Sequence, residues 1–165
     1  MDMNESTKHA IFELGVRIFS QHEQSMARIK DQILLEAEDS KMNINNLNLT
    51  DIHVIACIGS YEPINVTSIV EKIGVSKASI SKIGVKLHKM KLIRRTQLND
   101  NKKEVYFLLT AEGHRLHKLH ERIHNDIEAS IVRFLSAYTP EQLLFVKGLL
   151  QDALDYTTML NPAVK

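Results

Sequence analysis

Apolar residues recur at three- and four-residue spacings through most of this chain, a pattern that predicts a mainly helical protein. The first such stretch covers residues 6–38 without a proline, and we expect one long amphipathic helix with Ser6 or Thr7 as its N-cap. The Asn-rich segment 40–46 interrupts the pattern and predicts a loop. Thr50 is then expected to cap a second helix, with Asp51 in its first turn and an end near Gly59.

The next segment, residues 62–110, predicts a helix-turn-helix followed by a β-hairpin. Residues 62–65 indicate a turn, and residues 66–73 indicate a short helix. The Ser76 hydroxyl can cap a further helix that continues to about Met90. Residues 92–96 and 105–109 have the composition of two strands, and the segment Asn99-Asp100-Asn101 supplies turn-forming residues between them. This order is typical of a winged helix-turn-helix, which is a DNA-binding module.

Two further helices complete the predicted fold. Thr110 begins one that runs to about Ala137, and Pro140 opens a last one to about Met159, since proline at the first helical position loses no hydrogen bond. We therefore predict a mainly α protein with a small β-hairpin wing, forming a single domain over residues 1–165. The DNA-binding lobe covers residues 47–110. The helices at 6–38 and 111–160 are more apolar than a small lobe requires, so we expect them to form a homodimer.

Charge is strongly segregated, although the net charge is only +1. Residues 76–103 contain nine basic residues and one acid, a local charge of +8 that leaves −7 for the remainder. Such a concentration suits phosphate binding, because neutralised phosphates release counterions. The predicted DNA contacts are Ser76, Lys77, Ser79, Ser81, Lys82, Lys86, Arg94, Lys102 and Lys103.

The composition excludes several other classes of protein. One cysteine, Cys57, cannot form an internal disulfide, and its apolar neighbours favour a buried thiol. The N-terminus lacks the basic and apolar regions of a signal peptide, and no stretch has the roughly 18 apolar residues of a membrane span. We expect a cytoplasmic protein.

Four histidines recur along the predicted helix that follows the wing: His114, His117, His120 and His124. At about 100° per residue they fall within an arc of roughly 120°. His120 and His124 have the four-residue spacing that lets two imidazoles meet one ion from a single helix. Each histidine taken alone is better explained as a polar residue at a helix interface. Metal binding would require further ligands from His53 or from the His22-Glu23 pair.

The sequence resembles the MarR family of bacterial transcription regulators over nearly its whole length. The resemblance rests on the order of elements and on Leu49-Thr50 before helix two, VSKASISK in the recognition helix, MKLIRR before the wing and LLTAEGHRL after it. It implies a homodimeric repressor that binds a pseudo-palindromic operator in double-stranded DNA. One departure is the wing tip, Asp100-Asn101-Lys102-Lys103, where the family usually has arginine; lysine lacks the planar guanidinium group, which favours plain phosphate contact.

Within that family, the streptococcal and lactococcal zinc-uptake repressors have a similar set of ligands. The resemblance carries zinc ligation to Glu23 in Gln21-His22-Glu23, to His53, and to His120 and His124. Three nitrogens and one carboxylate suit tetrahedral Zn²⁺. The segment between Glu23 and His53 is longer here than in those repressors, so His22 or Glu36 is an alternative to Glu23, and a vestigial site is a further alternative.

Other functions remain open at this point. Within the family, a small organic ligand or an oxidant could release the regulator from DNA. A different class is an interaction module that does not bind DNA, which the local charge of +8 disfavours. We do not expect an enzyme, because the chain has no phosphate-binding glycine loop, nucleophile elbow or H-E-x-x-H motif.

Overall fold

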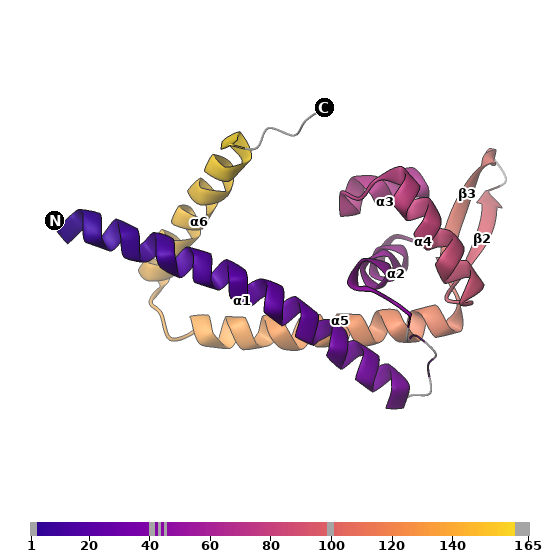
Figure 1. Ribbon diagram of the computed structural model, residues 1–165, viewed down its shortest axis with the longest axis horizontal. Coiled ribbons are helices and arrows are strands. Elements are labelled where there is room, and N and C mark those ends of the chain that lie inside the picture. The colour runs from indigo at the N-terminus through magenta and orange to yellow at the C-terminus, as the bar shows by residue number, and fades with distance from the viewer. Residues whose placement is uncertain (1–2, 40–41, 43, 45, 99–100, 161–165) are drawn as a thin grey trace. The chain divides into compact units, whose positions relative to one another are not determined.

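The computed structural model describes residues 3–39, 42, 44, 46–98 and 101–160 of the chain (Figure 1). The chain divides into two compact units at the boundary between Ile123 and His124, and helix α5 continues from the first unit into the second. The described part is mainly helical with one small antiparallel sheet, which confirms the predicted fold class. None of the helices in the described part is long and apolar enough to cross a membrane.

Helix α1 (Met3–Asp39) is one uninterrupted helix, as the spacing of its apolar residues predicts. It begins before Ser6 and Thr7, so the predicted N-cap at those residues is wrong. Glu5 lies in the first turn, where a carboxylate favours the helix dipole, and pairs with Lys8 at 2.7 Å. The last part of α1 packs against its own unit, where Ile33 and Ala37 are fully buried.

Helix α2 (Leu49–Tyr61) begins two residues earlier than predicted, because Asn48 rather than Thr50 is its N-cap. The Asn48 side chain accepts a hydrogen bond from the Asp51 amide at 2.9 Å, and the Asp51 carboxylate accepts one from the Asn48 amide at 2.8 Å. This reciprocal capping box satisfies two backbone donors at once. The helix continues past Gly59 to Tyr61.

The helix-turn-helix consists of α3 (Val66–Ile73) and α4 (Lys77–Lys89), which confirms both predicted helices. Gly74 ends α3 in the left-handed conformation, with φ of 73°, where a residue without a Cβ is favoured. The predicted cap at Ser76 is present, since its hydroxyl accepts a hydrogen bond from the Ser79 amide at 3.2 Å.

The wing is formed by β2 (Ile93–Leu98) and β3 (Asn101–Leu109), longer than predicted at the tip. A third strand, β1 (Ile64–Asn65), pairs with the other edge of β3, giving the order β1-β3-β2. The sequence predicts only a turn there, because two residues have no periodicity and become a strand only by pairing Ile64 with Phe107. The predicted turn residues Asn99 and Asp100 lie outside the described residues.

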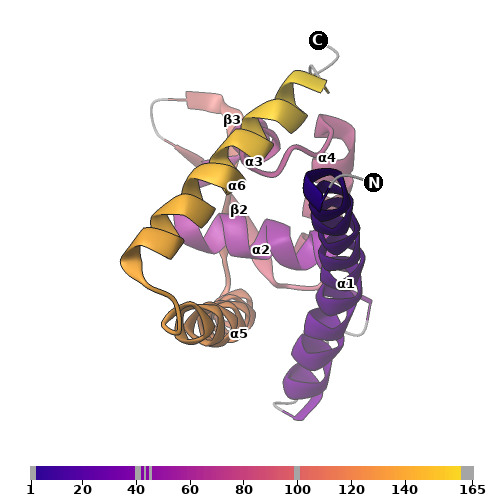
Figure 2. The same ribbon diagram turned by 90° about the vertical axis from the view of Figure 1, so that its left-hand side faces the viewer.

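Helix α5 (Ala111–Leu135) follows Thr110, whose hydroxyl accepts a hydrogen bond from the Gly113 amide at 3.1 Å, and α6 is Pro140–Leu160. Both views place α2 between the α3–α4 pair and the first part of α5 (Figures 1 and 2). The core of this first unit is aliphatic and includes Ile52, Ile55, Ile58, Ile69, Ile80, Leu87, Leu116 and Ile123. Helix α2 thus lies between the first part of α5 and the recognition helix α4.

Candidate DNA-binding and metal sites

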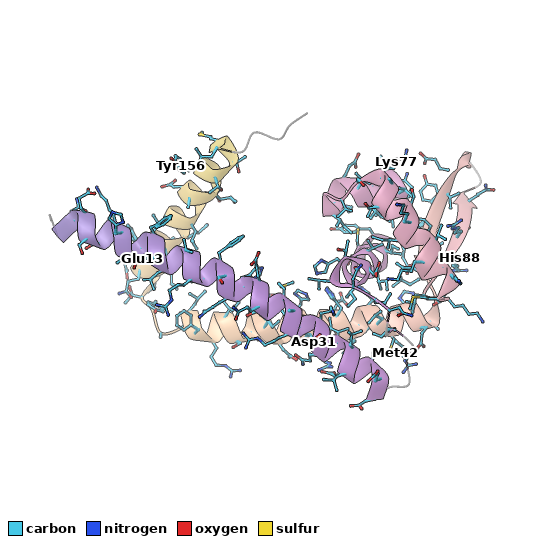
Figure 3. The ribbon with its side chains drawn as sticks, viewed as in Figure 1. Glu13, Asp31, Met42, Lys77, His88 and Tyr156 are labelled. Carbon is cyan, nitrogen blue, oxygen red and sulfur yellow. The ribbon has the colours of Figure 1, made fainter. Side chains whose placement is uncertain are left out.

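The exposed face of α4 carries Lys77, Ser81 and Lys82, three of the predicted DNA contacts. Figure 3 shows Lys77 at the start of this helix and His88 near its end. The opposite face is buried through Ile80, Gly84 and Leu87, so the helix is held in place while its basic face meets solvent. A basic helix of this kind can enter the major groove of DNA.

Ser76 and Ser79 have a structural use as well. The Ser76 hydroxyl caps α4, and the two side-chain oxygens lie 2.9 Å apart in a hydrogen bond. Ser79 is half-buried, whereas Ser76 is exposed. These two hydroxyls therefore already fix the start of the recognition helix.

Lys86 differs from the other predicted contacts because it turns inward. Its ammonium group lies 2.5 Å from the carboxylate of Asp51 in α2, and the Asp51 side chain is only 1% exposed. The same carboxylate oxygen accepts the capping bond from Asn48. Lys86 thus compensates a buried negative charge inside the lobe.

On the wing, the predicted contact Arg94 is exposed on β2. Its neighbour Arg95 lies over the ring of Phe107, with the guanidinium carbon 6.0 Å from the ring centroid. The side chains of Lys102 and Lys103 lie outside the described residues.

The histidines of α5 follow α2 along its length. His114 lies 3.1 Å from the carboxylate of Glu62, just after α2 ends, and Glu62 also accepts a hydrogen bond from the Leu109 amide at 2.5 Å. One turn later, His117 is 8% exposed and its ring lies against Gly59. A Cβ atom at Gly59 would be 2.6 Å from Cγ of that ring, so the close approach requires glycine there.

Further along, three of the four predicted metal ligands meet. One ligand atom from each of His53, His120 and His124 lies within 4.8 Å of the other two, and all three residues are half-buried. The rings of His53 and His120 are edge to face, with centroids 5.8 Å apart. His120 and His124 are one turn apart on the continuous helix α5. Around Zn²⁺ the donor atoms would be roughly 3.4 Å apart, given a Zn–N bond of about 2.1 Å, so small ring rotations would suffice.

The carboxylate predicted to complete this set does not join it. Glu23 is exposed on α1 and is not part of the group that the described residues form. The alternative His22 is exposed too, and Glu36 forms an ion pair with Arg122 of α5. The site is thus a three-imidazole group from α2 and α5, a donor set that suits Zn²⁺ with one coordination position left for water or another ligand.

Two residues shape these sites in ways that the sequence does not predict. The sequence predicts Asp51 only as a first-turn acid, although its position three residues after Asn48 resembles the capping-box signature. It predicts a helix end near Gly59, whereas the structure places the His117 ring against this glycine. No local pattern in the sequence predicts the ion pair of Asp51 with Lys86, because the two residues are 35 positions apart.

Comparison with known proteins agrees with this architecture. The family model described as MarR family matches residues 47–105. The chain is 42% identical to the HTH-type transcriptional regulator YhjH of Bacillus subtilis over 151 residues, which are 88% of this chain and 85% of that protein.

Two solved structures of the same fold are informative. The zinc-responsive MarR family member ZitR of Lactococcus lactis has a TM-score of 0.62 at 17% identity, covering 79% of this chain and 97% of ZitR. Streptococcus pneumoniae FabT, solved in complex with DNA, has a TM-score of 0.58 at 17% identity, covering 86% of this chain and 99% of FabT. The sequence relatives are named as transcriptional regulators, not enzymes. The chain belongs to the MarR family of DNA-binding transcriptional regulators.

Proposed function

We propose that this protein is a cytoplasmic, homodimeric repressor whose binding to DNA is strengthened by Zn²⁺ at His53, His120 and His124. The observation that carries the proposal is the meeting of these three imidazoles, one from α2 and two from α5. When bound, zinc would supply a coordination bond between the two helices. The histidines would hold α2 at a defined distance from α5 and so limit where the recognition helix can lie.

Metal can change DNA affinity only to the extent that it binds the DNA-competent conformation more tightly than the other. His53 lies in the same helix as the residues that contact α4, whereas His120 and His124 belong to the helix that leads toward α6. A site that joins these helices is suited to such a preference. The similarity to zinc-responsive ZitR supports the same interpretation.

The homodimer is proposed from apolar surface in both units. In the first unit, Phe12, Ile18 and Phe19 of α1 are each more than half exposed. In the second unit, α5 and α6 border a groove of about 660 Å³ lined mainly by apolar side chains such as Leu143, Val146 and Leu150. Exposed apolar surface of this extent marks an interaction site in a soluble protein.

A two-fold dimer would place two recognition helices on one face of the duplex. Its operator would then be a pseudo-palindrome with half-sites about one helical turn apart. We propose Lys77, Ser81 and Lys82 for the major groove and Arg94 for a phosphate. The remaining candidates from sequence analysis are Ser76 and Ser79 at the helix start and Lys102 and Lys103 at the wing tip.

The test is DNA binding with Zn²⁺ and with a chelator, using a palindrome selected from random sequence by the full-length protein. We expect zinc to tighten specific binding at least about fivefold, within the usual range of coupling between sites. His120→Ala should abolish the zinc effect and the bound zinc measured by mass spectrometry. His114→Ala is the matched control, because it removes a histidine of the same helix that lies outside the three-imidazole group. Equal specific binding in all conditions would refute the zinc response.

A second candidate function has one observation in its favour. A pocket of about 350 Å³ in the first unit is lined by Glu36, Met42, Arg115, Lys118, Leu119 and Arg122. Its three cations and the Glu36 carboxylate, which pairs with Arg122, leave a net charge of +2 beside two apolar side chains, and this combination suits a small organic acid. If DNA binding does not respond to zinc, release of the protein from DNA by such acids is the next measurement.

A further inference from the structure

The ion pair between Asp51 and Lys86 lies between the three-imidazole group and the recognition helix. Asp51 is in the first turn of α2, and its side chain is 1% exposed. One oxygen of its carboxylate accepts hydrogen bonds from the Asn48 amide at 2.8 Å and from the Lys86 ammonium at 2.5 Å. The aspartate is thus bound both to the start of α2 and to the last turn of α4.

Asp51 and His53 are two residues apart on the same helix. At about 100° per residue, their side chains leave the helix in nearly opposite directions. His53 therefore reaches α5, where its ring lies against that of His120, while Asp51 reaches α4. This agrees with the position of α2 between α4 and the first part of α5 in both views (Figures 1 and 2).

The ion pair between Asp51 and Lys86 differs in kind from the apolar packing around it. Ile52, Ile55 and Leu87 are fully buried, but apolar contacts have no required direction. A buried carboxylate, in contrast, must keep its cation, because a buried charge without a partner is strongly unfavourable. The ion pair would therefore couple a displacement of the first turn of α2 to the Lys86 side chain and, through it, to the recognition helix.

We propose that Asp51 is a positioning residue that transmits the state of the metal site to the recognition helix through Lys86. The inference rests on the proposed zinc function and deepens it, since it names the route from that site to DNA. It also gives Lys86 a role other than phosphate contact. Its charge is used inside the lobe to hold α4, while Lys77 and Lys82 remain on the exposed face.

The experiment measures the ratio of the DNA dissociation constants with chelator and with saturating Zn²⁺ in the full-length protein. The variants are Asp51→Asn, which keeps an oxygen acceptor for the cap, and Lys86→Met, which keeps the aliphatic stem and leaves the cap untouched. We expect each to bring the ratio close to one, while zinc affinity, measured by competition with a chelating dye, stays near that of the wild type. The double variant should lower the ratio no further than either single variant, because both substitutions remove the same ion pair.

Lys82→Gln is the matched control, an exposed lysine of the same helix. It should weaken DNA binding equally with and without zinc and leave the ratio unchanged. Melting curves for each variant show whether it is folded, and Lys86→Met tests the proposal even if Asp51→Asn does not fold.

Three results would overturn the inference, and they differ from one another. If the wild-type ratio exceeds one and both variants keep it, the ion pair is merely structural, even if stability falls. If Lys86→Met lowers the salt dependence of DNA binding by about one counterion while Asp51→Asn has no effect on the ratio, Lys86 contacts a phosphate instead. A wild-type ratio of one would remove the zinc function and this inference together.

Discussion

Gly59→Ala is the substitution whose effect the structure defines most sharply. Gly59 lies in α2, near its end, where the His117 ring of α5 packs against it. An added Cβ would lie 2.6 Å from Cγ and 2.8 Å from Nε2 of that ring. Ordinary carbon contacts are about 3.5 Å or longer, so the ring and its part of α5 must retreat by about 1 Å.

Two opposing contributions to the free energy of unfolding decide whether Gly59→Ala stabilises or destabilises the protein. Alanine favours a helix over glycine by about 0.5–1 kcal/mol. Overpacking of a buried contact costs typically about 1–3 kcal/mol. His117 is 8% exposed and enclosed by the helix pair, so the second term should dominate and the variant should be less stable by about 0.5–2 kcal/mol.

Urea unfolding of Gly59→Ala, His117→Ala and the double variant provides the assay. In the His117→Ala background the clash is absent, and the same glycine substitution should become neutral or stabilising by up to about 1 kcal/mol. The retreat of α5 should also separate His53 from His120 and weaken zinc binding in the single variant. A Gly59→Ala protein more stable than the wild type would refute the close approach of the two helices.

Three further predictions concern other contacts. Gly113→Ala should destabilise the protein by more than about 2 kcal/mol, because its Cβ would overlap the Leu92 carbonyl oxygen of the backbone, and a thermal melt equal to that of the wild type would contradict this. Hydrogen bonds from Gln32 and Arg122 lower the pKa of Glu36, so its carboxylate stabilises the fold above the ordinary glutamate pKa and loses that contribution as pH falls through the lowered value. The stability difference between wild type and Arg122→Gln should accordingly shrink on acidification, and a constant difference down to acid pH would argue against the pair. Burial raises the pKa of the Cys57 thiol, so maleimide labelling at pH 8 should be slow in the folded protein and fast in urea. Rapid labelling of the folded protein would contradict this and favour an oxidant-sensing role.

Local patterns in the sequence were sufficient for most of the fold. The helix Val66–Ile73, the Ser76 cap and the start of α5 after Thr110 depend on capping groups and periodicity within a few residues, so they could be predicted. The predicted α2 cap at Thr50 is wrong because another cap-forming residue, Asn48, stands two positions before it. Only the paired hydrogen bonds of Asn48 and Asp51 show which residue caps the helix. Strand β1 could not be predicted, since it exists only through its partner β3.

The candidate sites, like the fold, could be predicted from the sequence only in part. The basic character of the recognition helix and the four-residue spacing of His120 and His124 could be predicted, because each is a property of one helix. It could not be predicted that His53 meets these two histidines, that Glu23 is absent from the group formed by the described residues, or that Lys86 turns inward to Asp51. The period of a helix fixes the direction in which its side chains point, whereas contact between helices depends on how the apolar core packs them and on which cation lies beside a buried carboxylate.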